Sequence, residues 1–164
     1  MLTKNFYSYM RGAFSAAGKE IPFVKTDGTT TNLRYSNNFA PFTVMNKWSV
    51  DNNGFGVSFG KGTTPATMSD YSIESGLDGT QISVSYPNSV SYSRGDTFDE
   101  YSVSFGITNI TSDAITISEV GLIVGVNSGS SENKVLVDRT VLDAPVTIPA
   151  GQSKQITYTI RFNY

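Results

Sequence analysis

The first apolar side chains of the chain recur at spacings of three and four residues, which places them on one stripe of an α-helix. This stripe consists of Leu2, Phe6, Met10, Ala13, Phe14 and Ala17. Thr3 is placed to cap the helix and Gly18 to end it, so we expect an amphipathic helix over residues 1–18. A helix this short is marginal in water, so its stripe needs a cover. The cover is either the sheet of its own subunit or a neighbouring subunit.

Beyond residue 18 the apolar side chains alternate with polar ones, which is the period of a β-strand. A short strand begins at Ile21 and ends before an Asp-Gly turn. Residues 42–50 and 55–59 alternate on both sides of an Asp-Asn-Asn-Gly turn, which predicts a β-hairpin with Trp48 on its apolar face. The following segment, 60–70, is punctuated by Gly and Pro and is expected to be an exposed loop.

The second half of the chain has denser strand signals. Alternating runs cover residues 82–92, 101–107, 115–126, 135–148 and 156–162. The apolar register changes between Ile117 and Val120, for which a bulge near Ser118-Glu119 is the expected cause. Many short strands separated by turns are typical of a two-sheet sandwich. We therefore expect one mainly β domain, an antiparallel Greek-key/Ig-like or jelly-roll-like β-sandwich over residues 19–164, preceded by the short N-terminal α-helix over 1–18.

The composition argues against most enzyme chemistry. The chain has no Cys and no His, which excludes disulfides, Ser-His-Asp and Cys-His catalysis, and the commonest metal ligands. Asp, Glu, Lys and Tyr remain as catalytic groups. Charged residues are only 16% of the chain and the net charge is −2, so nucleic acid is not an expected partner. We expect no enzyme activity, no cofactor and no metal.

No apolar run approaches the ~18 residues that a membrane span needs. Lys4 and Arg11 interrupt the start of the chain, so a secretory signal is not expected either. We therefore expect no membrane partner and a protein that stays in the cytoplasm where it is made, or leaves by cell lysis.

Two groups of side chains suggest a catalytic or binding role, which has to be weighed against a purely structural one. Asp96, Asp99 and Glu100 cluster before a strand, and paired carboxylates serve glycosidases, although a solvated strand end has the same composition. Aromatic side chains in exposed loops, such as Tyr71 or Tyr92, suit stacking against sugars. The first group keeps an enzymatic hypothesis open through Asp99 and Glu100, and the second keeps carbohydrate binding open.

Three parts of the chain have a distinctive sequence. They are the opening Met-Leu-Thr-Lys-Asn-Phe-Tyr-Ser-Tyr-Met-Arg, the stretch from Gly62-Thr63-Thr64-Pro65-Ala66 to Ile73-Glu74-Ser75, and the stretch from Phe105-Gly106-Ile107-Thr108-Asn109 to Pro149-Ala150-Gly151-Gln152, which includes Ser118-Glu119-Val120-Gly121-Leu122 and Val137-Asp138-Arg139. Together these parts resemble small accessory virion proteins of tailed bacteriophages. The resemblance implies an Ig-like sandwich that assembles in the virion after synthesis in the host cytoplasm. It carries no catalytic residues over to this chain.

The pattern and the resemblance lead to one expectation and one alternative. We expect a non-enzymatic structural component of a tailed-phage virion, either a capsid auxiliary or decoration protein or a neck or tail protein. Its partners would be copies of itself and virion proteins such as the major capsid protein, with Leu2, Phe6, Met10 and Phe14 as one interface anchor. The alternative is a carbohydrate-binding or adhesion module on a virion or cell surface.

Overall fold

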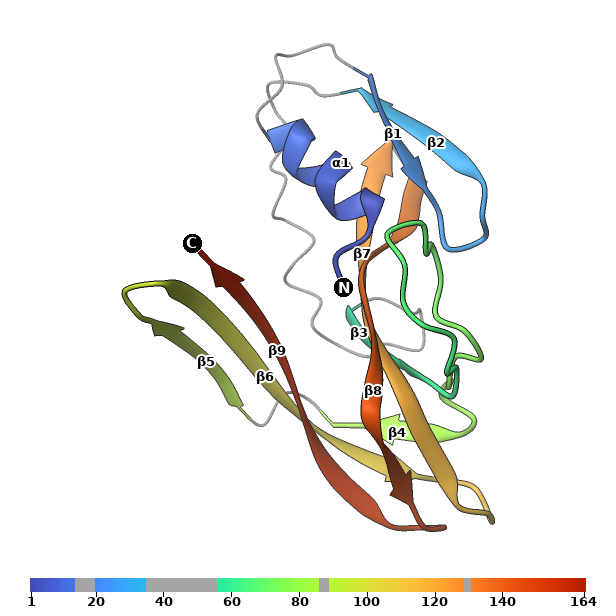
Figure 1. The fold of residues 1–164 in the computed structure, drawn as a ribbon. Coiled ribbons are helices and arrows are strands. Elements are labelled where there is room, and N and C mark those ends of the chain that lie inside the picture. The colour runs from blue at the N-terminus through green and yellow to red at the C-terminus, as the bar shows by residue number, and fades with distance from the viewer. Residues whose placement is uncertain (14–19, 35–55, 86–88, 129–130) are drawn as a thin grey trace. The chain divides into compact units, whose positions relative to one another are not determined.

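The computed structural model describes residues 1–13, 20–34, 56–85, 89–128 and 131–164. These residues form one α-helix and nine β-strands (Figure 1). The helix and strands are α1 (Lys4–Ala13), β1 (Glu20–Val24), β2 (Thr30–Arg34), β3 (Gly56–Gly60), β4 (Ile82–Val84), β5 (Ser89–Arg94), β6 (Phe98–Asn109), β7 (Ile115–Ser128), β8 (Ser131–Ile148) and β9 (Ser153–Asn163).

The strand ladders of the described residues are antiparallel. The predicted fold class, mainly β with antiparallel sheets and a short N-terminal helix, is confirmed, and the sheets are consistent with a β-sandwich. The Greek-key or Ig-like strand order and the division into residues 1–18 and 19–164 stay predictions. Several sequence features named above lie outside the described residues: Phe14, Ala17, the helix end at Gly18, Trp48, and the first arm and turn of the hairpin.

The chain folds into two compact units, each built from two separate segments. The first unit comprises Met1–Leu77 and Ile117–Val146, and the second comprises Asp78–Thr116 and Thr147–Tyr164. The helix, β1, β2 and β3 belong to the first unit together with most of β7 and β8. The second unit holds β4, β5, β6 and β9.

The first strand pair of the first unit follows the sequence pattern closely. Ile21 and Phe23 alternate with exposed neighbours on β1 and are 2% and 5% exposed. The chain then reverses at the predicted Asp-Gly turn, where Gly28 adopts a φ of 82° that favours glycine. Strand β2 returns antiparallel to β1, which confirms the predicted short strand and turn.

The main sheet of the first unit has the order β3-β7-β8. Val57 and Phe59 of β3 are fully buried, as the alternation predicted. The ladder between β3 and β7 is regular from Glu119 to Ile123, and β7 is buried on both faces in this stretch. The change of apolar register along β7 therefore needs no bulge from Glu119 onward, because residues on both faces are buried.

In the second unit the long strand β6 is central. Strand β9 pairs with one edge of β6 along its whole length, while β4 and β5 share the other edge (Figure 1). Val103, Phe105 and Ile107 of β6 are buried, which confirms the predicted strand and its apolar face from Val103 onward, whereas Tyr101 on the same face is 47% exposed. Before β9 the chain makes the predicted tight turn, in which the N–H of Gln152 donates to the carbonyl of Pro149 at 3.1 Å.

Candidate functional site

A buried arginine in the first unit gathers three carboxylates. Arg139 of β8 donates from Nε to Glu119 Oε2 at 2.7 Å and from Nη1 to Asp70 Oδ2 at 2.7 Å. Its Nη2 donates to the carbonyl of Thr64 at 3.2 Å and to Glu74 Oε2 at 3.4 Å. Arg139 is 3% exposed and Glu119 is 0% exposed, so this is an ion pair inside the protein.

The pKa shifts at this cluster follow from its hydrogen bonds. Burial opposes ionisation of Asp70, but hydrogen bonds from Thr67 and Arg139 outweigh that cost and lower the pKa of Asp70 below its ordinary value. Burial likewise opposes the charge of Arg139, yet its bonds to Asp70 and Glu119 raise its pKa. Both groups are therefore held in their charged forms.

The glycines around the cluster show how tightly it is packed. A Cβ on Gly60 would overlap the Glu119 carboxylate, and one on Gly121 would lie 2.8 Å from the carbonyl oxygen of Asp138. The N–H of Gly62 donates to Glu119 Oε1 at 3.1 Å. Through these contacts the segment between β3 and β4 is attached to β7 and β8. Residues 61–70 of this segment form a mostly exposed loop, as predicted, and the sequence did not indicate the contacts that hold it.

This arrangement is that of a structural ion-pair network. Hydrogen bonds from Thr64 and Thr67 engage Glu74 and Asp70 besides the guanidinium. Within the described part of the chain, every buried side-chain nitrogen or oxygen has a hydrogen-bond partner. The same residues contain no group of three or more His, Cys, Asp or Glu side chains arranged to hold a metal ion.

The N-terminal segment is attached to the first unit by polar contacts. The hydroxyl of Thr3, predicted as a helix cap, donates to the carbonyl of Leu136 at 2.6 Å. The Asn5 side chain donates to the carbonyl of Val24 at 2.7 Å and accepts from the N–H of Val24 at 2.9 Å. Thr3 and Asn5 are buried, so α1 is anchored within its own subunit.

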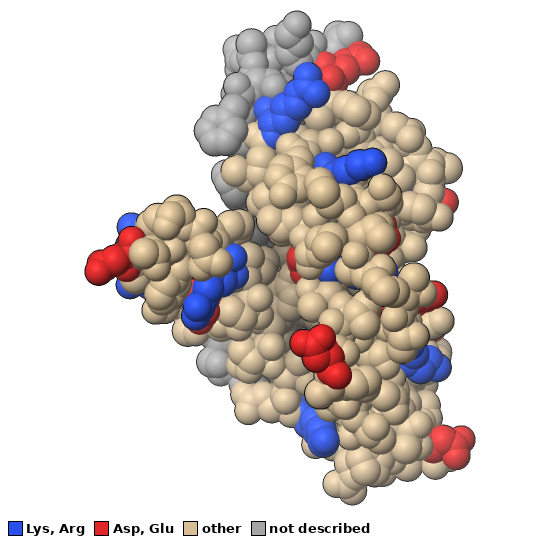
Figure 2. All heavy atoms as spheres, viewed as in Figure 1, with Lys and Arg blue, Asp and Glu red and all other residues tan. Residues whose placement is uncertain are grey.

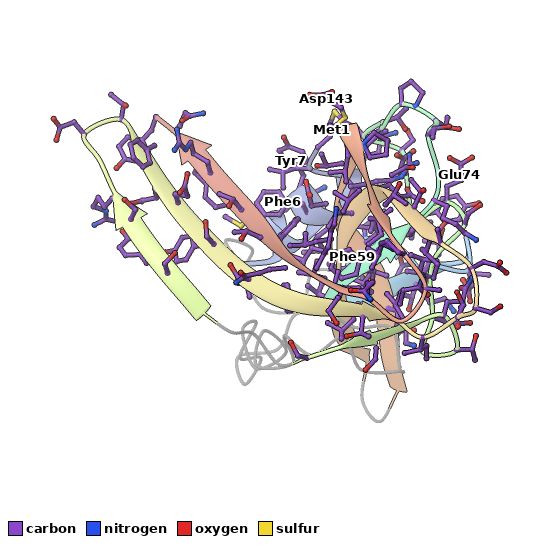
Figure 3. The ribbon with its side chains drawn as sticks, turned by 90° about the horizontal axis from the view of Figure 1, so that it is seen from below. Met1, Phe6, Tyr7, Phe59, Glu74 and Asp143 are labelled. Atoms are coloured by element: carbon purple, nitrogen blue, oxygen red, sulfur yellow. The ribbon has the colours of Figure 1, made fainter. Side chains whose placement is uncertain are left out.

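The predicted interface residues lie in different surroundings. Leu2 forms a β-bridge with Asp138 and is half-buried, and Phe6 is half-buried with its ring edge-on to Tyr7 at 5.6 Å (Figure 3). Met10 is 36% exposed, and Phe14 lies outside the described residues. Their role as an interface anchor stays a prediction.

The sheet of the second unit has two chemically different faces. In the register of the ladders, Tyr92, Tyr101 and Ile160 lie in one row, and Ser91, Ser102 and Thr159 lie in the neighbouring row on the opposite face. Hydroxyl pairs join β6 and β9 on the second face. They are Ser102–Thr159 at 2.7 Å, Ser104–Thr157 at 2.8 Å and Thr108–Ser153 at 2.7 Å.

The aromatic face ends in an exposed tyrosine pair. Tyr92 and Tyr101 are 50% and 47% exposed, and their ring centroids are 4.9 Å apart with the planes tilted by 41°. Asp99 accepts hydrogen bonds from Arg94 and from the hydroxyl of Tyr92. These bonds lower the pKa of Asp99 and raise the pKa of Tyr92.

The carboxylates singled out in the sequence are not brought together as a catalytic pair. Asp99 and Glu100 are neighbours on β6, so their side chains point to opposite faces. Asp99 pairs with Arg94, whose Nε lies 2.7 Å away, and Glu100 pairs with Arg161, whose Nη2 lies 2.6 Å away. Each of these two carboxylates is therefore one half of an exposed ion pair.

Sequence reasoning missed the Arg139 cluster, although a signal for it was present. Arg139 follows the apolar run Val135–Val137, and Glu119 lies between Ile117 and Val120. A charge inside a strand that is otherwise apolar needs a partner, because an unpaired buried charge is very costly. The identity of that partner depends on strand pairing, which alternation does not specify.

Comparison of the sequence with protein family models and curated proteins identified no relative. No protein family model matches the chain, and no curated protein matches it significantly. No helix among the described residues has both the length and the apolar character needed to cross a membrane.

Proposed function

We propose that this protein is a non-enzymatic structural component of a tailed-phage virion, which assembles through packed interfaces as a capsid auxiliary or decoration protein or as a neck or tail protein. Its partners are other copies of the chain and virion proteins such as the major capsid protein. The assignment to the virion rests on the resemblance of the three sequence segments described above. The assignment to assembly is supported by the sheet of the second unit.

The observation that carries the proposal is the exposed end of the β5-β6-β9 sheet. On one face of this end Tyr92 and Tyr101 are about half exposed, and on the other face Ser91 and Arg161 are exposed. A small sheet gains independent stability by packing an apolar face against something else. A partner that covers the tyrosine face would therefore stabilise the sheet, which is the behaviour of an assembly surface.

The distribution of charge suits a protein present in many copies. Figure 2 shows a face made mostly of uncharged residues, on which acidic and basic side chains lie intermixed. The net charge of the whole chain is only −2. Repulsion between neighbouring copies is therefore small.

Quantitative mass spectrometry of purified virions tests this function directly. We expect the chain in the particles at a fixed number of copies, and a Tyr92→Ser/Tyr101→Ser double variant at lower occupancy. The matched control is Tyr71→Ser, which removes a tyrosine of similar exposure, 43%, from the first unit. Particles that lack the wild-type chain altogether would show that the proposed function is wrong.

Carbohydrate binding is the second candidate, and the same exposed tyrosines favour it. Aromatic ring faces such as those of Tyr92 and Tyr101 can stack against sugar rings. A glycan array with the purified protein, repeated with Tyr92→Ala, tests this function. Binding to a defined glycan that disappears in the variant would support it, and signals at background level would exclude it.

A further inference from the structure

Among the described strands of the second unit, β9 has one long edge to which no other strand pairs. Within the described residues β9 pairs with β6 alone, over Ser153–Asn163. Backbone bonds at the two ends of this ladder join Asn109 to Gln152 and Tyr164 to Thr97. Because hydrogen-bonded and non-bonded pairs alternate along an antiparallel ladder, the even-numbered residues of β9 bond to β6. The N–H and C=O groups of its odd-numbered residues therefore point away from β6.

This edge lacks the features that normally protect an edge strand. Proteins usually protect such edges with charges, prolines, bulges or short strands. Between Gln155 and Ile160 the strand has no charged residue, no Pro and no Gly. Its odd-numbered residues from Ser153 to Asn163 are all exposed. The opposite edge of β6, in contrast, is divided between β4 and β5, which are three and six residues long.

We propose that two copies of this chain associate by antiparallel pairing of their β9 strands, an inference that rests on the proposed assembly function. The register with Tyr158 opposite Tyr158 of the second copy pairs the full length of β9. It places Ile156 opposite Ile160, Thr157 opposite Thr159, Gln155 opposite Arg161, and Lys154 opposite Phe162. The result is one continuous sheet that runs from β5 of one copy to β5 of the other.

The chemistry of β9 is complementary to itself in this register. Apolar side chains meet apolar ones on one face, and threonines meet threonines on the other, so the hydroxyl rows of both sheets become continuous. Cross-strand pairs of this kind stabilise a sheet, whereas like charges directly opposite one another destabilise it. Lys154 and Arg161, the two cations of β9, lie opposite uncharged residues, so no such repulsion arises. A twofold interface also uses the same edge of both copies, so this contact is complete in the dimer and adds no further copies.

Two single-cysteine proteins, Gln155→Cys and Arg161→Cys, test the register, since the chain has no cysteine of its own. In the proposed dimer these positions form a hydrogen-bonded pair with a Cα separation of about 5.5 Å, which a disulfide can bridge. Position 155 of one copy lies about 20 Å from position 155 of the other, given about 3.4 Å per residue. Upon oxidation we expect linked dimers from the mixture and none from either protein alone. Equal linking in all three samples would overturn the register.

Proline substitutions test the edge itself. Thr157→Pro and Thr159→Pro each remove an N–H that points outward, so the backbone bonds between β9 and β6 remain. Each variant also loses its hydroxyl bond to Ser104 or Ser102. Thr157→Val is the matched control, because it loses the same hydroxyl but keeps the N–H and the strand propensity. By sedimentation velocity we expect association at least about tenfold weaker in both proline variants and close to wild type in the control. Circular dichroism and unfolding midpoints check that each variant is folded. If a proline variant does not fold, disulfide linking in the cysteine mixture decides whether the β9 edges form the interface.

The outcomes separate this inference from the proposed function. If proline variants that are folded associate as tightly as wild type, the β9 edge is not the interface, although self-assembly stands. If the wild-type chain stays monomeric and the cysteine mixture does not link, the dimer is wrong. Virion occupancy then still tests the proposed function, since another virion protein would supply the contacts.

Discussion

At the scale of single residues, two arginine–glutamate pairs among the described residues have similar lengths and different burial. Arg139 lies 2.7 Å from Glu119, and Arg161 lies 2.6 Å from Glu100. The first arginine side chain is 4% exposed and the second 51%. Burial raises the cost of breaking a pair, because the charge left behind has no water to solvate it. The Arg139 pair is therefore part of the folding of the first unit, whereas the Arg161 pair contributes little.

Removing the buried cation should leave Glu119 unpaired inside the first unit. For Arg139→Met we expect the free energy of unfolding to fall by about 3–5 kcal/mol, as for other broken buried pairs. Arg161→Met is the matched control, with an expected loss of at most about 1 kcal/mol. Denaturation in urea measures both. Equal effects of the two substitutions would contradict a structural role for the Arg139 cluster.

Asp70 should give the first unit an acid-sensitive part of its stability. Its pKa lies below the ordinary 3.8, so the folded state favours the carboxylate and this contribution is complete above about pH 5. It is lost as the pH falls below 4 and through the lowered pKa. We expect the difference in unfolding free energy between wild type and Asp70→Asn to be constant from pH 7 to about 5 and to shrink below about pH 4. A difference that stays constant down to pH 3 would contradict this assignment.

At the scale of elements, alternation alone predicts the strands that have one buried face. Strand β1 shows the expected alternate burial. In β3 and β6 the predicted apolar residues Val57, Phe59, Val103, Phe105 and Ile107 are buried, but some of their neighbours are buried as well. Strand β7 departs from the pattern because both of its faces are buried between Glu119 and Ile123, and the resulting change of apolar register resembles a bulge in the sequence. The pattern therefore predicts where strands occur, but it does not predict how many faces of a strand are covered.

The contacts that organise the first unit could not be predicted in the same way. Arg139 and Asp70 are 69 residues apart in sequence, and the hydroxyl of Thr3 reaches a carbonyl 133 residues away. Contacts between residues so far apart leave no periodic pattern in the sequence, because they depend on which strands become neighbours in the fold. Turn chemistry was local and therefore predictable, as at Gly28 and in the turn before β9.

The helix α1 should depend on its polar anchor more than on its apolar stripe. Asn5 is 3% exposed, and its amide also donates to the carbonyl of Leu136 at 3.2 Å. For Asn5→Ala we expect a loss of about 1–3 kcal/mol in the free energy of unfolding, because the N–H and carbonyl of Val24 lose the Asn5 side chain as their partner. Lys4→Ala, an exposed change in the same helix, should have little effect. Thermal unfolding of the two variants checks this, and equal midpoints would argue against the anchor.

At the scale of the whole molecule, the two compact units differ in how their polar groups are used. The first unit is held together by the buried Arg139 cluster and the N-terminal segment. The second unit has a sheet with an exposed tyrosine pair, and its strand β9 has no charged residue from Gln155 to Ile160. The first unit is thus completed by contacts within the chain, whereas the sheet of the second unit supports the proposal of contacts with other copies.

The central claim is that this chain assembles with copies of itself. Light scattering of the purified wild-type protein over a wide concentration range tests it most directly. The account predicts that the mass rises from that of one chain, 17.7 kDa, to a discrete multiple that begins with the dimer. A mass of 17.7 kDa at every concentration would contradict the claim.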